Sequence, residues 1–159
     1  FSPQSFREGL PDIVAAQLAE NGLAADRLTI EVTESLVMDD VCLQTARQVG
    51  ALGVGLSIDD FGTGFSAISR LPFLPITELK IDRSFLQGID QSPASLALTR
   101  AVVGIGDSLG LAVVAEGVET VRQGELLREL GCHLGQGFLF AKPEPADAFE
   151  QWLTRNDVG

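Results

Sequence analysis

Short apolar strands alternate with helical segments along this chain, and that alternation constrains the fold more than any other feature. Apolar patterns predict five strands, at residues 28–34, 54–60, 78–82 and 111–116 and within 133–138, which also contains the exit loop of the fifth strand. Helical spacing and end signals predict helices at 11–20, 39–52, 67–71, 93–109, 120–130 and 146–152. Strands that alternate with helices form a parallel sheet, because each helix returns the chain to the start of the next strand. The predicted class is therefore α/β.

Two details of packing follow from the same patterns. The helix at 39–52 is expected to bury Val41, Thr45, Val49 and Leu52. The strand at 111–116 is almost continuously apolar, which is typical of a strand that is buried on both faces.

Polar side chains follow the apolar part of every predicted strand. These strand-end residues are Glu31, Asp59 with Asp60, Lys80, Glu116 and Gln136. Because parallel strands end at the same face of a sheet or barrel, we expect these side chains to converge. Adjacent carboxylates repel one another, and a divalent cation with oxygen ligands removes that repulsion. The pattern therefore favours metal-assisted chemistry on a phosphate ester.

Each of these residues also has an ordinary structural interpretation. The Asp59–Asp60 pair could be a solvated turn followed by Gly62 and Gly64. Lys80 could be an exposed cation, or it could orient or deprotonate a water or stabilise a departing oxygen. The remaining members, Glu31, Glu116 and Gln136, could be strand-end groups that satisfy nearby loops.

The other potentially reactive side chains suggest no further site. The single histidine, His133, is expected to be a packing or loop residue. Cys42 and Cys132 show no metal or disulfide spacing and are expected to be small core residues.

Composition limits the partners and the compartment. The net charge of −11 argues against a broad DNA or RNA interface, although metals could mediate contact with a small anionic ligand. The sequence shows no signal peptide and no apolar run long enough to span a membrane. We therefore expect a cytoplasmic region without membrane contact, in a parent that other domains could anchor.

Five motifs occur in order along the chain. They are Glu31-Val-Thr-Glu34, Asp59-Asp60-Phe-Gly-Thr-Gly-Phe-Ser66, Leu79-Lys80-Ile-Asp82, Ala115-Glu116-Gly-Val-Glu119-Thr and Gln136-Gly137. As a set they closely resemble the EAL-domain family of bacterial phosphodiesterases, which open cyclic di-GMP to linear pGpG. The resemblance covers essentially residues 1–159 and implies a single domain with a modified (β/α)₈ barrel, the TIM barrel.

The resemblance also implies two Mg²⁺ or Mn²⁺ ions and a role for each strand-end residue. Glu31 and Asp59 would bind one ion, and Asp59 would bridge to a second ion on Asp60. Lys80 would contact the attacking water. Glu116 would help to hold metal and water, with Gln136 hydrogen-bonded in the outer sphere of the metal.

Further residues would support the site in such a protein. Glu34 would brace the loop at 61–66, which contains Gly62 and Gly64, and so link metal binding to homodimer formation. Glu119 resembles a substrate-side or structural neighbour of Glu116. Sensory or diguanylate-cyclase (GGDEF) domains are common additional parts of such proteins.

One departure from the family pattern concerns the beginning of the domain. The Glu-Ala-Leu motif and a metal-binding Asn are absent, and Ser2 aligns with the Ser of the Asn-x-Ser segment. We therefore expect the last five strand-helix units of a barrel, from a catalytically competent parent. We also expect little turnover by the fragment unless the missing strands are supplied.

Two other functions remain open at this point. A non-catalytic cyclic di-GMP receptor could use the same fold, although it would not need the intact set of metal ligands. An unrelated barrel enzyme could use Mg²⁺ and Lys80 for enolate chemistry, although the adjacent Asp59–Asp60 pair makes this less favourable.

Overall fold

The computed structural model describes residues 9–34, 39–63 and 67–156 and arranges them around one parallel sheet. Its strands are β1 (Thr29–Thr33), β2 (Gly55–Phe61), β3 (Glu78–Ile81), β4 (Ala112–Glu116) and β5 (Leu134–Gln136). Each strand pairs in parallel with the next, in the order of the sequence. That order is typical of a barrel wall, because a doubly wound sheet reverses its direction of growth.

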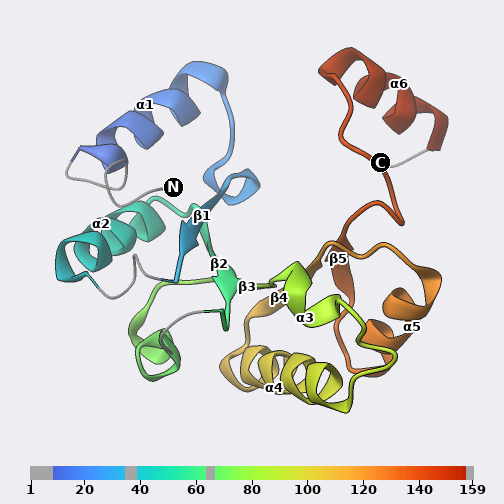
Figure 1. The fold of residues 1–159 in the computed structure, drawn as a ribbon. Helices are drawn as coiled ribbons and strands as arrows, with labels where there is room; N and C mark the ends of the chain where they lie inside the picture. Colours follow the sequence, from blue (N-terminus) through green and yellow to red (C-terminus); the bar gives the residue numbers. More distant parts are fainter. Residues whose placement is uncertain (1–8, 35–38, 64–66, 157–159) are drawn as a thin grey trace.

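The sheet is curved and open (Figure 1). Within the described residues it ends at β1 on one side and at β5 on the other. The α/β class and the partial barrel are therefore confirmed. No helix in the described part of the chain has the length and apolar character needed to cross a bilayer.

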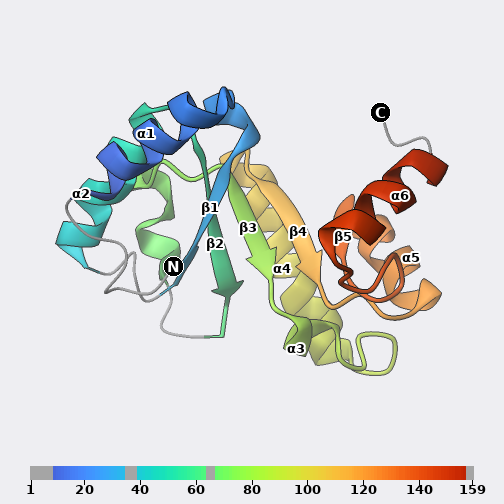
Figure 2. The same ribbon diagram turned by 90° about the horizontal axis from the view of Figure 1, so that it is seen from above.

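Helices accompany this sheet, most of them on its outer side, and the last one stands apart from the strands (Figure 1). They are α1 (Leu10–Asn21), α2 (Asp40–Ala51), α3 (Arg83–Leu86), α4 (Pro93–Leu109), α5 (Val121–Glu129) and α6 (Ala146–Asn156). Helix α4 packs across β3 and β4, as Figure 2 shows. Because the strands are parallel, their carboxyl ends lie along one edge of the sheet, where the polar side chains lie.

Local sequence signals begin and end these helices. The Asp39 side chain accepts hydrogen bonds from the N–H groups of Val41 and Cys42 at 2.8 and 3.1 Å and caps α2. Thr120 and Gln123 form a reciprocal capping box at the start of α5. Helix α4 begins with Pro93 after the cap Ser92 and ends at a left-handed Gly110.

The core lies between the outer face of the sheet and the helices. Leu56 and Ile58 of β2 and Leu79 and Ile81 of β3 are almost completely buried there. Gly106 brings α4 into close contact with β4, because a Cβ at this position would lie 2.2 Å from Val113 Cγ2. The alternation along the strands thus directs one set of side chains to the core and the other to the inside of the barrel.

Several packing and boundary predictions were wrong. Val41 is 64% exposed, because α2 turns Cys42, Thr45, Ala46 and Val49 toward the sheet. On β4, Val113 and Ala115 are buried, but Ala112 is exposed and Val114 only half-buried, because they face the open inside of the barrel. The strand is therefore fully buried on one face only.

Short helical turns also differ from the predicted pattern. The predicted helix at 67–71 is replaced by two 3₁₀ turns, η3 (Ala67–Ser69) and η4 (Leu71–Phe73), with Pro72 in the first turn of η4. Helix α3 was not predicted, because it is a single turn that begins directly after β3.

Candidate metal and phosphate site

The strand-end residues converge around the Lys80 ammonium. Its Nζ lies 2.7 Å from Glu31 Oε1, 3.3 Å from Asp59 Oδ1 and 2.5 Å from Glu116 Oε1. These carboxylates come from β1, β2 and β4, and Lys80 comes from β3 between them. Only 6% of the Lys80 side chain is exposed, so the exposed cation considered from the sequence is wrong.

An irregularity in β2 brings the two adjacent aspartates together. Neighbouring residues of a regular strand point to opposite faces of the sheet. The pairing of β2 with β3 shifts register between Ile58 and Phe61, and Asp60 has a φ of +53°, which is rare for a residue with a side chain. One carboxylate oxygen from each of Asp59, Asp60 and Glu116 lies within 4.8 Å of the other two.

The chemistry of these donors fits a hard divalent cation. Three carboxylates offer oxygen atoms to a common point, and such ligands suit Mg²⁺, Mn²⁺ and Ca²⁺. Glu31 extends the acidic set, because its carboxylate lies 2.7 Å from the Lys80 ammonium that also contacts Asp59 and Glu116. The described residues could therefore hold metal between the ends of β1, β2 and β4.

Asp82 adjoins this cluster through its contact with Asp60, and it was not predicted from the sequence as a site residue. Its carboxylate accepts a hydrogen bond from Ser84 N at 2.9 Å, which caps α3, and its side chain is also hydrogen-bonded with Asp60. Its position directly after the Lys80 strand is the signal that identifies it, because polar residues at the other strand ends also belong to the site.

The pKa values of Asp60 and Asp82 are shifted in opposite directions. Partial burial, the charges of Asp59 and Asp82 and the hydrogen bond with Asp82 all raise the pKa of Asp60. Burial opposes ionisation of Asp82 as well, but hydrogen bonds to Ser84 and Arg83 outweigh burial and lower its pKa. A cation would relieve the repulsion that Asp60 experiences.

Lys80 has a strongly stabilised charge. Burial alone would lower the pKa of its ammonium, but hydrogen bonds to Glu116 and Glu31 and the charge of Asp59 raise that pKa above its ordinary value. In this arrangement Lys80 is a hydrogen-bond donor and not a base. The deprotonating role considered from the sequence therefore finds no support in these contacts.

Two supporting contacts surround the cluster. Gln136 Nε2 donates to Glu116 Oε1 at 2.6 Å, and the buried Glu34 accepts a hydrogen bond from Gly62 N at 3.1 Å. Gly62 has a φ of +91°, and a Cβ there would lie 3.0 Å from the Phe85 ring. Gly64 and the segment 64–66, like Ser2, lie outside the described residues.

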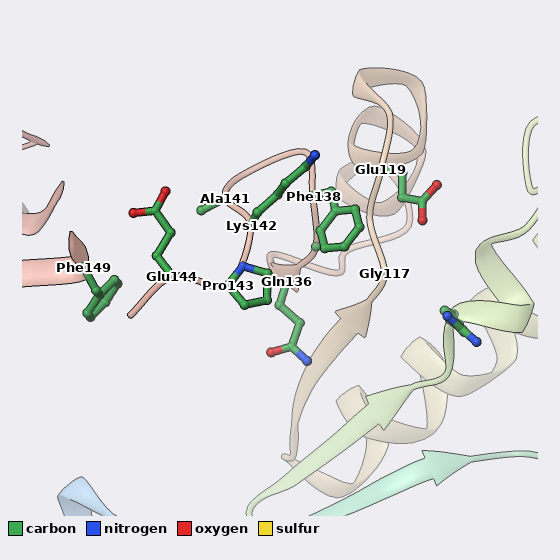
Figure 3. Close-up of a pocket in the computed structure, with 11 residues that line it drawn as sticks. Gly117, Glu119, Gln136, Phe138, Ala141, Lys142, Pro143, Glu144 and Phe149 are labelled. Carbon is green, nitrogen blue, oxygen red and sulfur yellow. The ribbon is translucent and has the colours of Figure 1, made fainter. Parts of the chain in front are cut away.

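A cavity of about 600 Å³ adjoins Gln136 (Figure 3). Phe138, Lys142 and Glu119 contribute to its lining, together with Arg83 and Gly117. The Lys142 ammonium lies 5.7 Å from the centre of the Phe138 ring. The cavity thus offers an aromatic face and cationic groups beside the acidic cluster, and Glu119 lies on it and not among the carboxylates around Lys80.

The other candidate residues take structural positions. Cys42 and Cys132 are buried, and the Cys132 thiol donates to Val113 O at 3.3 Å, so both are core residues as predicted. His133 is exposed beside β5. None of these three residues is among the groups that contact Lys80 or form the carboxylate cluster.

Comparison with known proteins places this geometry in a family. The model of the EAL domain matches residues 1–143. The chain is 45% identical over 147 residues to the oxygen sensor protein DosP of Escherichia coli, covering 91% of this chain and 18% of DosP. It is 46% identical over 141 residues to the bifunctional diguanylate cyclase/cyclic di-GMP phosphodiesterase MucR of Pseudomonas aeruginosa, covering 87% of this chain and 21% of MucR.

Solved structures agree with this assignment. The PaMucR phosphodiesterase in complex with c-di-GMP superposes with a TM-score of 0.88 at 44% identity, over 94% of this chain and 62% of that one. The manganese/c-di-GMP complex of Klebsiella pneumoniae BlrP1 superposes with a TM-score of 0.77 at 37% identity, over 84% of this chain and 35% of that one. The chain spans about a fifth of the length of the curated relatives it matches. The chain belongs to the EAL domain family.

Proposed function

We propose that this chain is the catalytic part of a metal-dependent phosphodiesterase that opens cyclic di-GMP to linear pGpG. The observation that carries this proposal is the cluster of Asp59, Asp60 and Glu116 oxygens within 4.8 Å of one another beside the buried Lys80. Relatives that act on cyclic di-GMP, and a complex that contains manganese together with this ligand, support the same chemistry.

The proposed metal ligands come from three strands. Glu31 and Asp59 would hold one Mg²⁺ or Mn²⁺ ion, and Asp59, Asp60 and Glu116 would hold a second. Bound divalent ions would lower the pKa of a coordinated water and offset charge on the reacting phosphoryl group. Gln136 would keep Glu116 oriented through the hydrogen bond that it donates at 2.6 Å.

Lys80 acts on the phosphoryl group and the water as a hydrogen-bond donor in this proposal. Its ammonium lies beside the same carboxylates, where it can reach a water or a phosphoryl oxygen held between them. The oxygen of a water would bond to phosphorus, one bridging P–O bond would break, and a proton of that water would end on the departing ribose oxygen, so that the product is a linear dinucleotide. Lys80 would hold the attacking water and stabilise negative charge that develops on oxygen.

The cavity beside Gln136 is the proposed substrate cleft. Phe138 offers a ring for stacking on a purine base, and Arg83 and Lys142 offer positive charge near phosphate oxygens. This arrangement explains how a chain with a net charge of −11 can bind an anionic dinucleotide. The cationic side chains of Arg83 and Lys142 lie at this one cavity, and bound metals would neutralise the acidic cluster.

Assembly is a separate part of the proposal. Residues 1–159 form one EAL-type unit that further strands beside β1 and β5 complete, since both are sheet edges among the described residues. A homodimer would form near Gly62, where Ile68 is 48% and Leu98 is 52% exposed and both line one small cavity with Gly62. Sedimentation at increasing concentration tests the dimer, which a Leu98→Asp variant should abolish.

Chromatographic separation of cyclic di-GMP from pGpG after incubation with Mn²⁺ or Mg²⁺ tests the activity. We expect little turnover by this chain alone, and a chelator or Asp60→Asn should abolish the turnover of this chain or of a longer one. Asp26→Asn, an equivalent change at an exposed position outside the cluster, should leave turnover unchanged. If this chain shows no turnover, turnover by a longer chain extended upstream would support the proposed activity. Tight nucleotide binding without turnover in both would instead support the receptor.

A further inference from the structure

Lys80 contacts the same carboxylate oxygens that the proposed function assigns to metal ions. Its ammonium lies within 3.3 Å of one oxygen from each of Glu31, Asp59 and Glu116. These three residues belong to β1, β2 and β4. The Lys80 side chain therefore connects β3 with β1, β2 and β4 near the carboxyl ends of these strands.

This arrangement differs from the other ion pairs of the described residues. The pairs Arg70–Asp40, Arg122–Glu125 and Arg122–Glu129 involve side chains that are all at least 37% exposed. Such surface pairs contribute little to stability, because water screens them. The Lys80 side chain is only 6% exposed, so its charge depends on the carboxylates and not on water for its stabilisation.

Charge arithmetic gives this contact a second consequence. Clustered carboxylates repel one another unless a cation lies between them. A divalent ion bound to the same oxygens would face the ammonium as a like charge at close range. The ammonium and the metal therefore neutralise the same groups and cannot both do so with full strength.

We propose that Lys80 is the internal counter-ion of the metal-free site: its ammonium holds Glu31, Asp59 and Glu116 together before metal binds, and it competes with the incoming ions for their oxygens. The inference rests on the metal site of the proposed function, and it goes beyond that site by giving Lys80 a role in the metal-free protein. Lys80 acts here as a positioning residue that preserves the spacing of the ligands.

This role predicts two effects of opposite sign when the ammonium is removed. The metal-free protein loses stability, because three carboxylates are left without their shared cation. The metal-bound protein loses much less, and metal binds more tightly, because no ammonium has to be displaced. A residue that only orients the ligands would give weaker metal binding instead, and a purely structural tie would lower stability equally with and without metal.

Thermal unfolding and calorimetric titration of Lys80→Met with Mn²⁺ separate these possibilities. After treatment with a chelator, Lys80→Met should unfold at a temperature lower than the wild-type chain by more than about 5 °C. Saturating Mn²⁺ should remove most of that difference. The affinity for Mn²⁺ should rise by about tenfold or more.

A matched control corrects for the change in net charge. Lys142→Met removes the same ammonium from an exposed position, so it should change neither the metal-free unfolding temperature nor the Mn²⁺ affinity appreciably. If Lys80→Met does not fold without metal, Mn²⁺ should restore folding, and the charge-conserving Lys80→Arg should fold without metal.

The outcomes distinguish this inference from the proposed function. Weaker Mn²⁺ binding by Lys80→Met, or unchanged stability of its metal-free form, would overturn the counter-ion role while leaving the metal site intact. Absence of Mn²⁺ binding by the wild-type chain would instead overturn the metal site and the competition with it. In that case, lower stability of metal-free Lys80→Met would still test the role of Lys80 as a counter-ion.

Discussion

Asp60 combines a strained backbone with a carboxyl group that resists ionisation. Its positive φ of +53° and the raised pKa of its carboxyl group are both unfavourable in the metal-free protein. Both follow from aiming its carboxylate at Asp59 and Glu116. Strain of this kind is expected at a site that is built for a ligand, because the ligand supplies the compensation.

Asp60→Asn should therefore stabilise the metal-free chain and weaken metal binding. The amide removes the repulsion from Asp59 and Asp82, and Asn tolerates a left-handed backbone better than most residues. Because the group is largely exposed and screened by water, we expect the unfolding temperature to rise by only about 1–3 °C. Thermal unfolding in chelator checks this, and a fall in that temperature would contradict the account.

The pH dependence of stability follows from Lys80. Its pKa is raised above the ordinary 10.5, so its pairing contributes stability fully below that pH and loses it as the pH rises through the higher folded-state value. The difference in unfolding free energy between the wild-type chain and Lys80→Met should stay constant from about pH 7 to pH 10 and shrink above it. Urea unfolding of the metal-free proteins measures it, and a difference that grows above pH 10 would be inconsistent with the pairing.

At the scale of elements, the close packing of α4 against the sheet depends on Gly106. A Cβ on Gly106 would lie 2.2 Å from Val113 Cγ2, whereas a Cβ on Gly104 would meet nothing within 4 Å. Gly106→Ala should therefore destabilise the chain by about 1–3 kcal/mol through overpacking. Gly104→Ala in the same helix should stabilise it by about 0.5–1 kcal/mol. Denaturant unfolding of both variants provides the comparison, and equal effects would show that α4 does not pack as described.

The sequence predicted the elements better than their junctions. Helix α4 has the predicted bounds, and all five strands occur where the apolar patterns of the sequence placed them, because caps and apolar patterns are local signals. Val41 was wrongly assigned to the core, since only packing against the sheet decides which face of α2 turns inward. The contacts of Asp82 depend on the bulge in β2 and on the single turn of α3, and no local pattern predicts either feature.

For the whole molecule, the acidic cluster and the adjoining cavity form one continuous edge of the sheet. Gln136 belongs to both, because it donates to Glu116 and also lines the cavity with Phe138. The proposed function therefore separates chemistry at the ends of β1–β4 from recognition beyond β5. The two regions should respond differently to substitution.

Phe138→Ala should weaken cyclic di-GMP binding by about tenfold, which is the loss expected for one stacking contact with a base. The rate at saturating substrate should change much less, because Phe138 is not one of the residues that contact Lys80 or form the carboxylate cluster. Phe73→Ala provides a control, since Phe73 is 70% exposed on η4 and does not line this cavity. KM and kcat for each variant check the prediction, and a loss confined to kcat would contradict the assignment of the cleft.

The central claim is that the strand ends bind divalent metal, and calorimetric titration with Mn²⁺ tests it most directly. The account predicts two ions per chain for the wild type and for Asp26→Asn, and fewer ions or much weaker binding for Asp60→Asn. Binding that is absent in the wild-type chain, or undiminished in Asp60→Asn, would contradict it.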